Sequence, residues 1–186
     1  VKNINPEASV GWHVWQGVAW DPIYRAEMDY ADLVEYSDWL KPVVYHDAAG
    51  PRTRAWMLDK MEKTVFGDTN PQTALAFLYD IMGYDRNREP AYDELQTNGY
   101  SPNYVYRETK RCVDGVEDRI PVYPGVGFDV PVRSPEFRSR PEVVSEAVRE
   151  AFRAGAKGLI LSREYDEMRI ENLQAVGKVI HDAWNG

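Results

Sequence analysis

Two patterns of apolar residues alternate along the chain, one typical of strands and one typical of helices. The sequence therefore predicts strands that alternate with helices. Short runs rich in apolar, aromatic and β-branched residues predict four strands, at 9–15, 39–45, 120–130 and 158–161. Apolar residues at every third or fourth position predict helices at 29–36, 52–66, 71–82, 102–114, 141–154 and 168–184. Strands separated by helices are typical of parallel β/α units with crossover connections, so the pattern indicates an α/β fold.

Several of the predicted helices have recognisable ends. Asn70 and Ser101 each precede a proline, an order typical of an N-cap followed by proline at the first helical position. Gly83 is expected to end the helix that starts after Asn70, because glycine adopts the left-handed conformation of a C-cap. Residues 139–142, Ser-Arg-Pro-Glu, match a capping box, which predicts that the Ser139 side chain caps the next helix.

The net charge and the cysteine content argue against several classes of protein. The chain has 22 Lys and Arg against 30 Asp and Glu, a net charge of −8, which argues against nucleic-acid binding and against adhesion to anionic membranes. No apolar run approaches the roughly 20 residues that span a bilayer. Cys112 is the single cysteine, so an intrachain disulfide is excluded and a core position is expected. No nucleotide-binding fingerprint follows a strand, and we expect no cofactor.

The aromatic content is the unusual feature of the composition. The chain has six tryptophans and twelve tyrosines, and five of the tryptophans lie at or before position 56. Such side chains either form a tryptophan-rich core or offer flat apolar platforms for sugar rings. The 186 residues suffice for one domain, and we expect residues 1–186 to form a single domain.

Three long segments resemble the C-terminal half of the barrel in uncharacterised bacterial glycoside-hydrolase-like proteins. They are GWHVW at 11–15, PIYRAEMDYADLVEYSDWLKPVVYHDAAGPR at 22–52 and GAKGLILSREYDEMRIENLQAVG at 155–177. Four parallel strands make either a small open sheet or half of a (β/α)8 barrel, which needs eight. The resemblance implies the second: strands five to eight of a TIM-like barrel whose N-terminal half is absent from this chain.

The resemblance also implies a carbohydrate-active enzyme, most simply a glycoside hydrolase that cleaves an O-glycosyl bond. Its site would lie at the C-terminal ends of the strands, as in other barrels of this kind. Glycosidic cleavage uses a pair of carboxyl groups, and Asp129, Glu164 and Asp47 follow predicted strands. A loop cap for Asp129 and an ion pair of Glu164 with Arg163 or Arg169 are the structural alternatives.

Polar and aromatic residues at the same strand ends are expected to bind the substrate. Neutral imidazoles can hydrogen-bond sugar hydroxyls or assist proton transfer, aromatic rings can stack on the sugar, and arginines can hold an acidic group. The expected substrate-binding residues are His13, Trp15, Trp20, Tyr45, His46, Arg52 and Arg163.

Two other functional classes remain open from the sequence. A metal-dependent sugar isomerase or hydrolase would need His13, His46, Asp129 and Glu164 to converge on one divalent ion, although no short-spaced metal motif is present. A non-catalytic carbohydrate-binding fragment would need a second copy of the chain, or a separate N-terminal half-barrel polypeptide, to cover its unpaired strand edges. Because the chain begins at Val1 rather than Met, a secreted or periplasmic protein with its leader removed is among the expectations.

Overall fold

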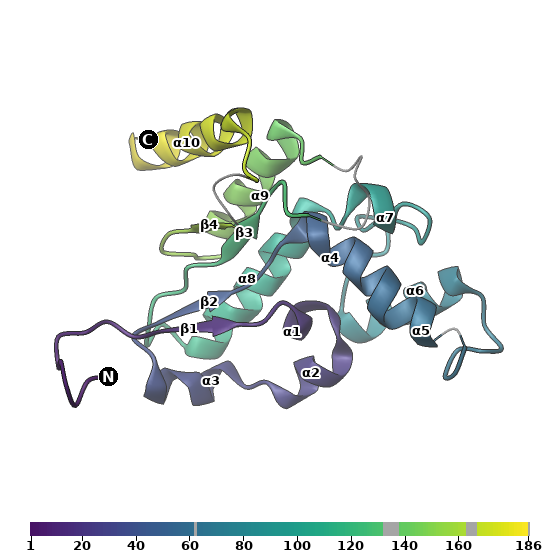
Figure 1. The fold of residues 1–186 in the computed structure, drawn as a ribbon, viewed down its shortest axis with the longest axis horizontal. Helices are drawn as coiled ribbons and strands as arrows, with labels where there is room; N and C mark the ends of the chain where they lie inside the picture. The colour runs from purple at the N-terminus through teal and green to yellow at the C-terminus, as the bar shows by residue number, and fades with distance from the viewer. Residues whose placement is uncertain (62, 132–137, 163–166, 186) are drawn as a thin grey trace.

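The computed structural model describes residues 1–61, 63–131, 138–162 and 167–185 (Figure 1). Its strands are β1 (Gly11–Val14), β2 (Trp39–Pro42), β3 (Gly125–Gly127) and β4 (Ile160–Ser162). The short helices are α1 (Gly17–Trp20), α2 (Pro22–Glu27), α3 (Tyr30–Leu33), α5 (Asp59–Met61) and α7 (Leu95–Asn98), with a 3-10 turn η1 (Val34–Tyr36). The longer helices are α4 (His46–Thr53), which continues into a π-helical turn η2 (Arg54–Leu58), α6 (Pro71–Met82), α8 (Pro102–Val116), α9 (Pro141–Arg153) and α10 (Ile170–Asn185).

The prediction of half a (β/α)8 barrel is wrong. Helices dominate the structure, and the strands form two separate parallel pairs, β1 with β2 and β3 with β4. Two isolated bridges, Leu40 to Val122 and Val43 to Gly125, are the further strand contacts in the described part of the chain. The predicted strand 120–130 shrinks to three residues because Pro121 and Pro124 have no N–H to donate to a ladder.

Two of the predicted helix starts are confirmed. Asn70 accepts a hydrogen bond from the amide of Thr73 at 2.9 Å, and Ser101 accepts one from the amide of Asn103 at 3.1 Å. In each case proline is the first helical residue. Gly83 ends α6 in the left-handed conformation, with φ of 68°.

Two other helix starts differ from the prediction. The helix expected at 52–66 begins six residues earlier, at His46, and passes through Pro51 before the π-helical turn η2. The predicted capping box at 139–142 is not formed: Arg140 occupies the N-cap of α9, and no side chain caps that helix. The Ser139 hydroxyl instead donates to a carboxylate of α4, as described below.

The main core lies between the strands and α6, α8, α9 and α10. Cys112 of α8 is fully buried, as predicted. Beside it, Glu108 is buried, and it forms ion pairs with Arg25 at 2.7 Å and with Arg111 at 2.9 Å. A charge buried with two partners of opposite sign has a structural role that needs no ligand. Within the described residues, each helix is too short or too polar to cross a membrane.

Replacing Gly177 with alanine is expected to stabilise the fold by about 0.5 to 1 kcal/mol, because an interior helical glycine leaves the unfolded chain more freedom than alanine does. Gly177 lies on the exposed face of α10, and an added Cβ would meet nothing within 4 Å. Gly115 in α8 is the matched control, since its Cβ would lie 2.9 Å from that of Tyr30. Compared with the wild-type protein, the urea midpoint should be higher for G177A and lower for G115A. A shift in the same direction for both variants would contradict the close packing of Gly115 against Tyr30.

Candidate functional site

A cavity of about 590 Å³ lies between the start of α4, the segment 88–102 and the segment 138–143. Figure 1 shows α7 beside the upper end of α4, next to this region. The lining residues are His46, Asp47, Arg88, Glu89, Pro90, Glu94, Thr97, Asn98, Gly99, Tyr100, Ser101, Pro102, Arg138, Ser139, Arg140 and Val143. The three wall segments are far apart in the sequence, so only the assembled fold creates the cavity.

Backbone packing between α4 and the end of α7 sets one wall. Gly99 follows α7 with φ of 66° and ψ of −161°, a conformation that is nearly exclusive to glycine. A Cβ on Gly99 would lie 2.6 Å from the Cα of Asp47, so no larger residue fits. The amide of Tyr100 then donates to the carbonyl of His46 at 2.7 Å. These contacts hold the first turn of α4 at the cavity wall.

The N-terminal ends of three helices meet at the cavity. His46 and Asp47 are the first residues of α4, Pro102 is the first residue of α8, and Arg140 is the N-cap of α9. The N-terminus of a helix carries a partial positive charge and unpaired backbone N–H groups. The cavity is therefore polarised in favour of negative charge, although the whole chain carries −8.

Asp47 is the buried carboxyl group of the cavity wall. Its Oδ2 accepts a hydrogen bond from the Ser139 hydroxyl at 2.7 Å, and its Oδ1 accepts one from the amide of Ala48 at 2.8 Å. Burial raises the pKa of Asp47 from 3.8 to about 7; these two hydrogen bonds lower it, and the nearby charge of Asp129 adds to the rise. Asp47 therefore retains a proton over part of the population near neutral pH, as a general acid requires.

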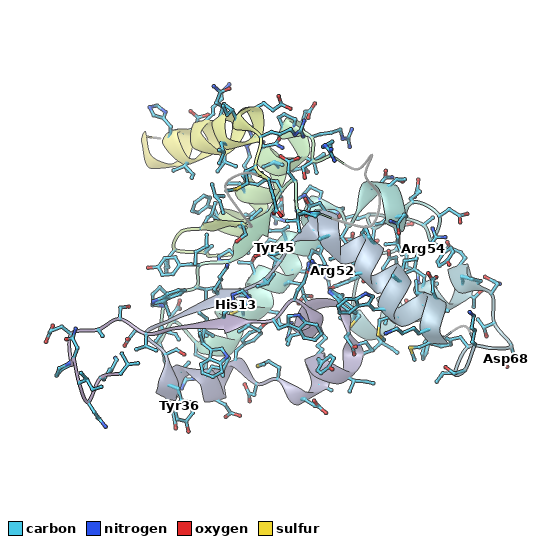
Figure 2. The ribbon with its side chains drawn as sticks, in the orientation of Figure 1. His13, Tyr36, Tyr45, Arg52, Arg54 and Asp68 are labelled. Atoms are coloured by element: carbon cyan, nitrogen blue, oxygen red, sulfur yellow. The ribbon has the colours of Figure 1, made fainter. Side chains whose placement is uncertain are left out.

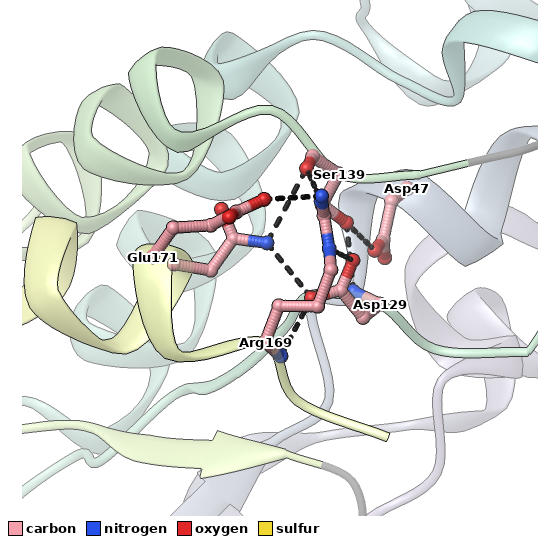
Figure 3. A network of polar contacts seen from close by, with 6 residues as sticks. Asp47, Asp129, Ser139, Arg169 and Glu171 are labelled. Atoms are coloured by element: carbon pink, nitrogen blue, oxygen red, sulfur yellow. Dashed lines mark hydrogen bonds and ion pairs between the residues drawn. The ribbon is translucent and has the colours of Figure 1, made fainter.

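Ser139 connects the Asp47 carboxylate to the backbone of a second acidic residue, Asp129 (Figure 3). The Ser139 hydroxyl accepts a hydrogen bond from the backbone amide of Asp129 at 2.8 Å. The Asp129 side chain accepts bonds from Arg169 at 3.1 Å and from Asn172 at 2.8 Å, and both donors also bond the Ser139 carbonyl. Asp129 has a positive φ of 55° and a buried side chain, and it is not among the residues that line the cavity.

His46 is buried next to Asp47 and is one of the residues that line the same wall. Burial lowers the pKa of His46 from 6.5 to about 4, so the imidazole is neutral at physiological pH. Within the described part of the protein, Nδ1 of His46 has no hydrogen-bond partner. A buried ring nitrogen without a partner is costly, and a ligand hydroxyl at this wall would relieve that cost.

Three arginines and three carboxyl groups line the cavity, and the carboxyl groups already accept hydrogen bonds from other groups of the protein. Glu89 accepts from the amide and the hydroxyl of Ser101, both at 2.9 Å, and burial raises the pKa of Glu89. Glu94 accepts from the amide of Ala91 at 2.9 Å and remains exposed. The side chains of Arg88 and Arg140 are exposed at the rim.

The structure brings only part of the predicted site together. His46 and Asp47 line the cavity, and Asp129 lies one residue behind it through Ser139. Figure 2 shows Tyr45 at the start of α4, Arg52 within α4 and His13 on β1. Tyr45 is buried and Arg52 donates to Gln16, so neither faces the cavity.

The remaining predicted residues lie elsewhere. His13 pairs in register with Lys41; burial and the Lys41 charge lower the pKa of His13. Trp20 is 2% exposed and cannot serve as a platform, whereas Trp15 is half exposed and packs edge-on against it at 6.2 Å. Glu164 and Arg163 lie outside the described residues. The metal-dependent alternative finds no support among the described residues, which contain no group of three or more His, Cys, Asp or Glu arranged to hold an ion.

Sequence reasoning missed several residues of the site. Ser139 was assigned to a capping box, and the arginines at 88, 138 and 140 were given no role. Arg169 was considered only as an ion-pair partner for Glu164, whereas it holds Asp129. The unused signal is the cluster of arginine and serine at 138–140 directly before a helix with proline at its first position, because basic side chains and a helix N-terminus both favour an anion. No family model matches the chain, and no curated protein is significantly similar to it.

Proposed function

We propose that this protein is a carbohydrate-active enzyme that binds a sugar in the cavity and hydrolyses a glycosidic bond with Asp47 as the proton donor. The observation that carries the proposal is the Asp47 carboxyl group: it is buried in the wall of a ligand-sized cavity, and burial raises its pKa to about 7. Cavities of several hundred Å³ with a few convergent polar groups are typical of small-molecule sites.

Hydrolysis needs a second carboxyl group with a different role. Glu94 supplies it in this proposal, since it lines the same cavity and remains exposed. Asp47 gives its proton to the glycosidic oxygen as the bond to the anomeric carbon breaks. Glu94 either takes a proton from the attacking water or attacks the anomeric carbon itself; in the second case water later releases the sugar. Asp129 has a positioning role through Ser139, because its acceptor groups are occupied by Arg169 and Asn172.

Replacement of Asp47 with asparagine tests the proton donor. Hydrolysis of glycosides with a poor leaving group, such as an unactivated disaccharide, should fall about 10²- to 10⁴-fold, the usual contribution of general acid catalysis. Hydrolysis of a dinitrophenyl glycoside of the same sugar should fall far less, because that leaving group departs without a proton. The measurement is kcat for both substrates across a panel of sugars.

Asp68→Asn is the matched control, since it makes the same chemical change at an exposed position in the segment between α5 and α6 (Figure 2). It should leave both rates unchanged. Equal losses in Asp47→Asn for the two leaving groups would point to a damaged fold and would remove Asp47 from acid catalysis. Retention of full activity on the disaccharide would reject the proposed function.

A non-catalytic sugar-binding role is the second candidate. It is favoured by one observation: both oxygens of Asp47 already accept hydrogen bonds, and its side chain is almost inaccessible. Saturable binding of a sugar without turnover by the wild-type protein would support this role over hydrolysis.

A further inference from the structure

We infer that the sugar bound in this cavity carries an anionic group, a carboxylate or a phosphate, which is held by Arg140, Arg88 and the N-terminus of α9. The inference rests on the proposed function, because it names the class of sugar that the same site takes. Three independent features of the cavity support it: the arginines at its rim, an uncapped helix start, and the state of its own carboxyl groups.

The arginines give the cavity rim a positive charge that contrasts with the protein as a whole. Arg88, Arg138 and Arg140 line it, in a chain with eight more acidic than basic residues. Among the described residues, the contacts of the Arg88 side chain are long, 3.7 Å to Asp85 and 3.4 Å to Asn103. A guanidinium group presents paired donors that match a carboxylate or a phosphate.

The first turn of α9 adds backbone donors at the same place. Arg140 is its N-cap and provides no side-chain cap, Pro141 has no N–H, and Val143 lines the cavity. In the described part of the chain the amides of Glu142 and Val143 therefore have no capping side chain. A helix of 13 residues with an uncapped start favours an anion within its first turn.

The carboxyl groups of the cavity do not cancel this positive charge. Burial raises the pKa of Asp47 to about 7, which reduces its negative charge near neutral pH, and burial also raises the pKa of Glu89. The Glu89 side chain also accepts hydrogen bonds from the amide and the hydroxyl of Ser101, at the start of α8. Glu94 is the one lining carboxylate, among the described residues, that faces solvent.

The unpartnered His46 side chain distinguishes a sugar acid from a simple anion. His46 is buried at the wall, and Nδ1 has no partner among the residues that the structure places. An inorganic anion held at the rim would leave this nitrogen unsatisfied. A ligand with hydroxyl groups as well as a negative charge can serve the arginines and the imidazole together.

Binding measurements with a set of matched sugars test the inference. Isothermal titration calorimetry on the full chain would compare glucuronate, galacturonate and glucose 6-phosphate with glucose, galactose and inorganic phosphate. The charged sugars should bind at least about tenfold more tightly than the neutral sugars, which corresponds to one strong charge-assisted contact. Whether the uronates or the sugar phosphate rank first identifies the source of the anion.

Arg140→Gln should weaken the charged sugars about tenfold and leave the neutral sugars unchanged. Arg149→Gln is the matched control, because Arg149 is exposed on the same helix, outside the cavity lining, and should have no effect. Equal affinity for charged and neutral sugars would overturn the inference while leaving the proposed function intact. Inorganic phosphate that binds as tightly as the sugar phosphate would also overturn it, since the sugar would then add nothing. Failure of every sugar to bind would reject the proposed function itself.

Discussion

Replacing Gly99 with alanine should lower the free energy of unfolding by about 3 to 5 kcal/mol. Two costs add together. The backbone at Gly99, with φ of 66° and ψ of −161°, is in a region that alanine avoids. The new Cβ would also lie 2.6 Å from the Cα of Asp47 and 2.7 Å from the carbonyl oxygen of His46. These atoms belong to the backbone, so no side chain can move aside to relieve the clash.

Gly83→Ala is the matched control for this prediction. Gly83 also has a positive φ, 68°, but its Cβ would meet only the end of the Arg107 side chain, at 3.0 Å. It should therefore cost about 1 kcal/mol, the usual penalty of a left-handed alanine. Urea denaturation of the three proteins gives both values. Similar losses in G99A and G83A would show that α4 and the end of α7 are not packed backbone to backbone.

Asp47 and its neighbour His46 should have opposite effects on the pH dependence of stability. The pKa of Asp47 is raised from 3.8 to about 7, so between these values the folded state holds a proton that the unfolded state has lost. The contribution of Asp47 to the free energy of unfolding is therefore largest at low pH. It falls by on the order of 4 kcal/mol as the pH rises from 3.8 to about 7. The pKa of His46 is lowered from 6.5 to about 4, so the unfolded state holds the extra proton. Stability from His46 rises with pH across 4 to 6.5, by on the order of 3 kcal/mol.

The two effects should nearly cancel between pH 4 and 6.5 in the wild-type protein, leaving a decline near pH 7. Asp47→Asn should expose the His46 effect, a clear rise in stability from pH 4 to 6.5. His46→Gln should expose the Asp47 effect, a fall from pH 4 to 7. Chemical denaturation at half-unit steps of pH would measure all three curves. Parallel curves for the wild type and both variants would mean that neither group has the shifted pKa.

Local signals in the sequence were enough to predict several helix ends but not the sheet. Asn70, Ser101 and Gly83 act through hydrogen bonds within a few residues, so their roles follow from the local sequence. Strand pairing depends on contacts between distant segments. The apolar character of residues 120–130 predicted a long third strand. Pro121 and Pro124 cannot donate hydrogen bonds to a neighbouring strand, so the strand is shorter than predicted.

The candidate site was predictable to a similar extent. His46 and Asp47 were found because they follow a strand, and both line the cavity. The partner of Asp47 was not found, because the local pattern assigned Ser139 to its own helix, whereas its hydroxyl bonds a carboxylate 92 positions earlier. Asp129 was predicted to be catalytic from its place after an apolar strand. Its bonds to Arg169 and Asn172, 40 and 43 positions later, instead support a positioning role.

The cavity walls come from three segments that meet only in the folded chain, and this has a thermodynamic consequence. The unfolded protein has no such cavity, so a ligand that binds there binds only the folded state and stabilises it by mass action. At a concentration one hundred times its dissociation constant, a ligand would add about 2.7 kcal/mol to the free energy of unfolding. The melting temperature of the protein is therefore itself a detector of the ligand, and it responds to any sugar that occupies the site, whether or not the sugar is cleaved.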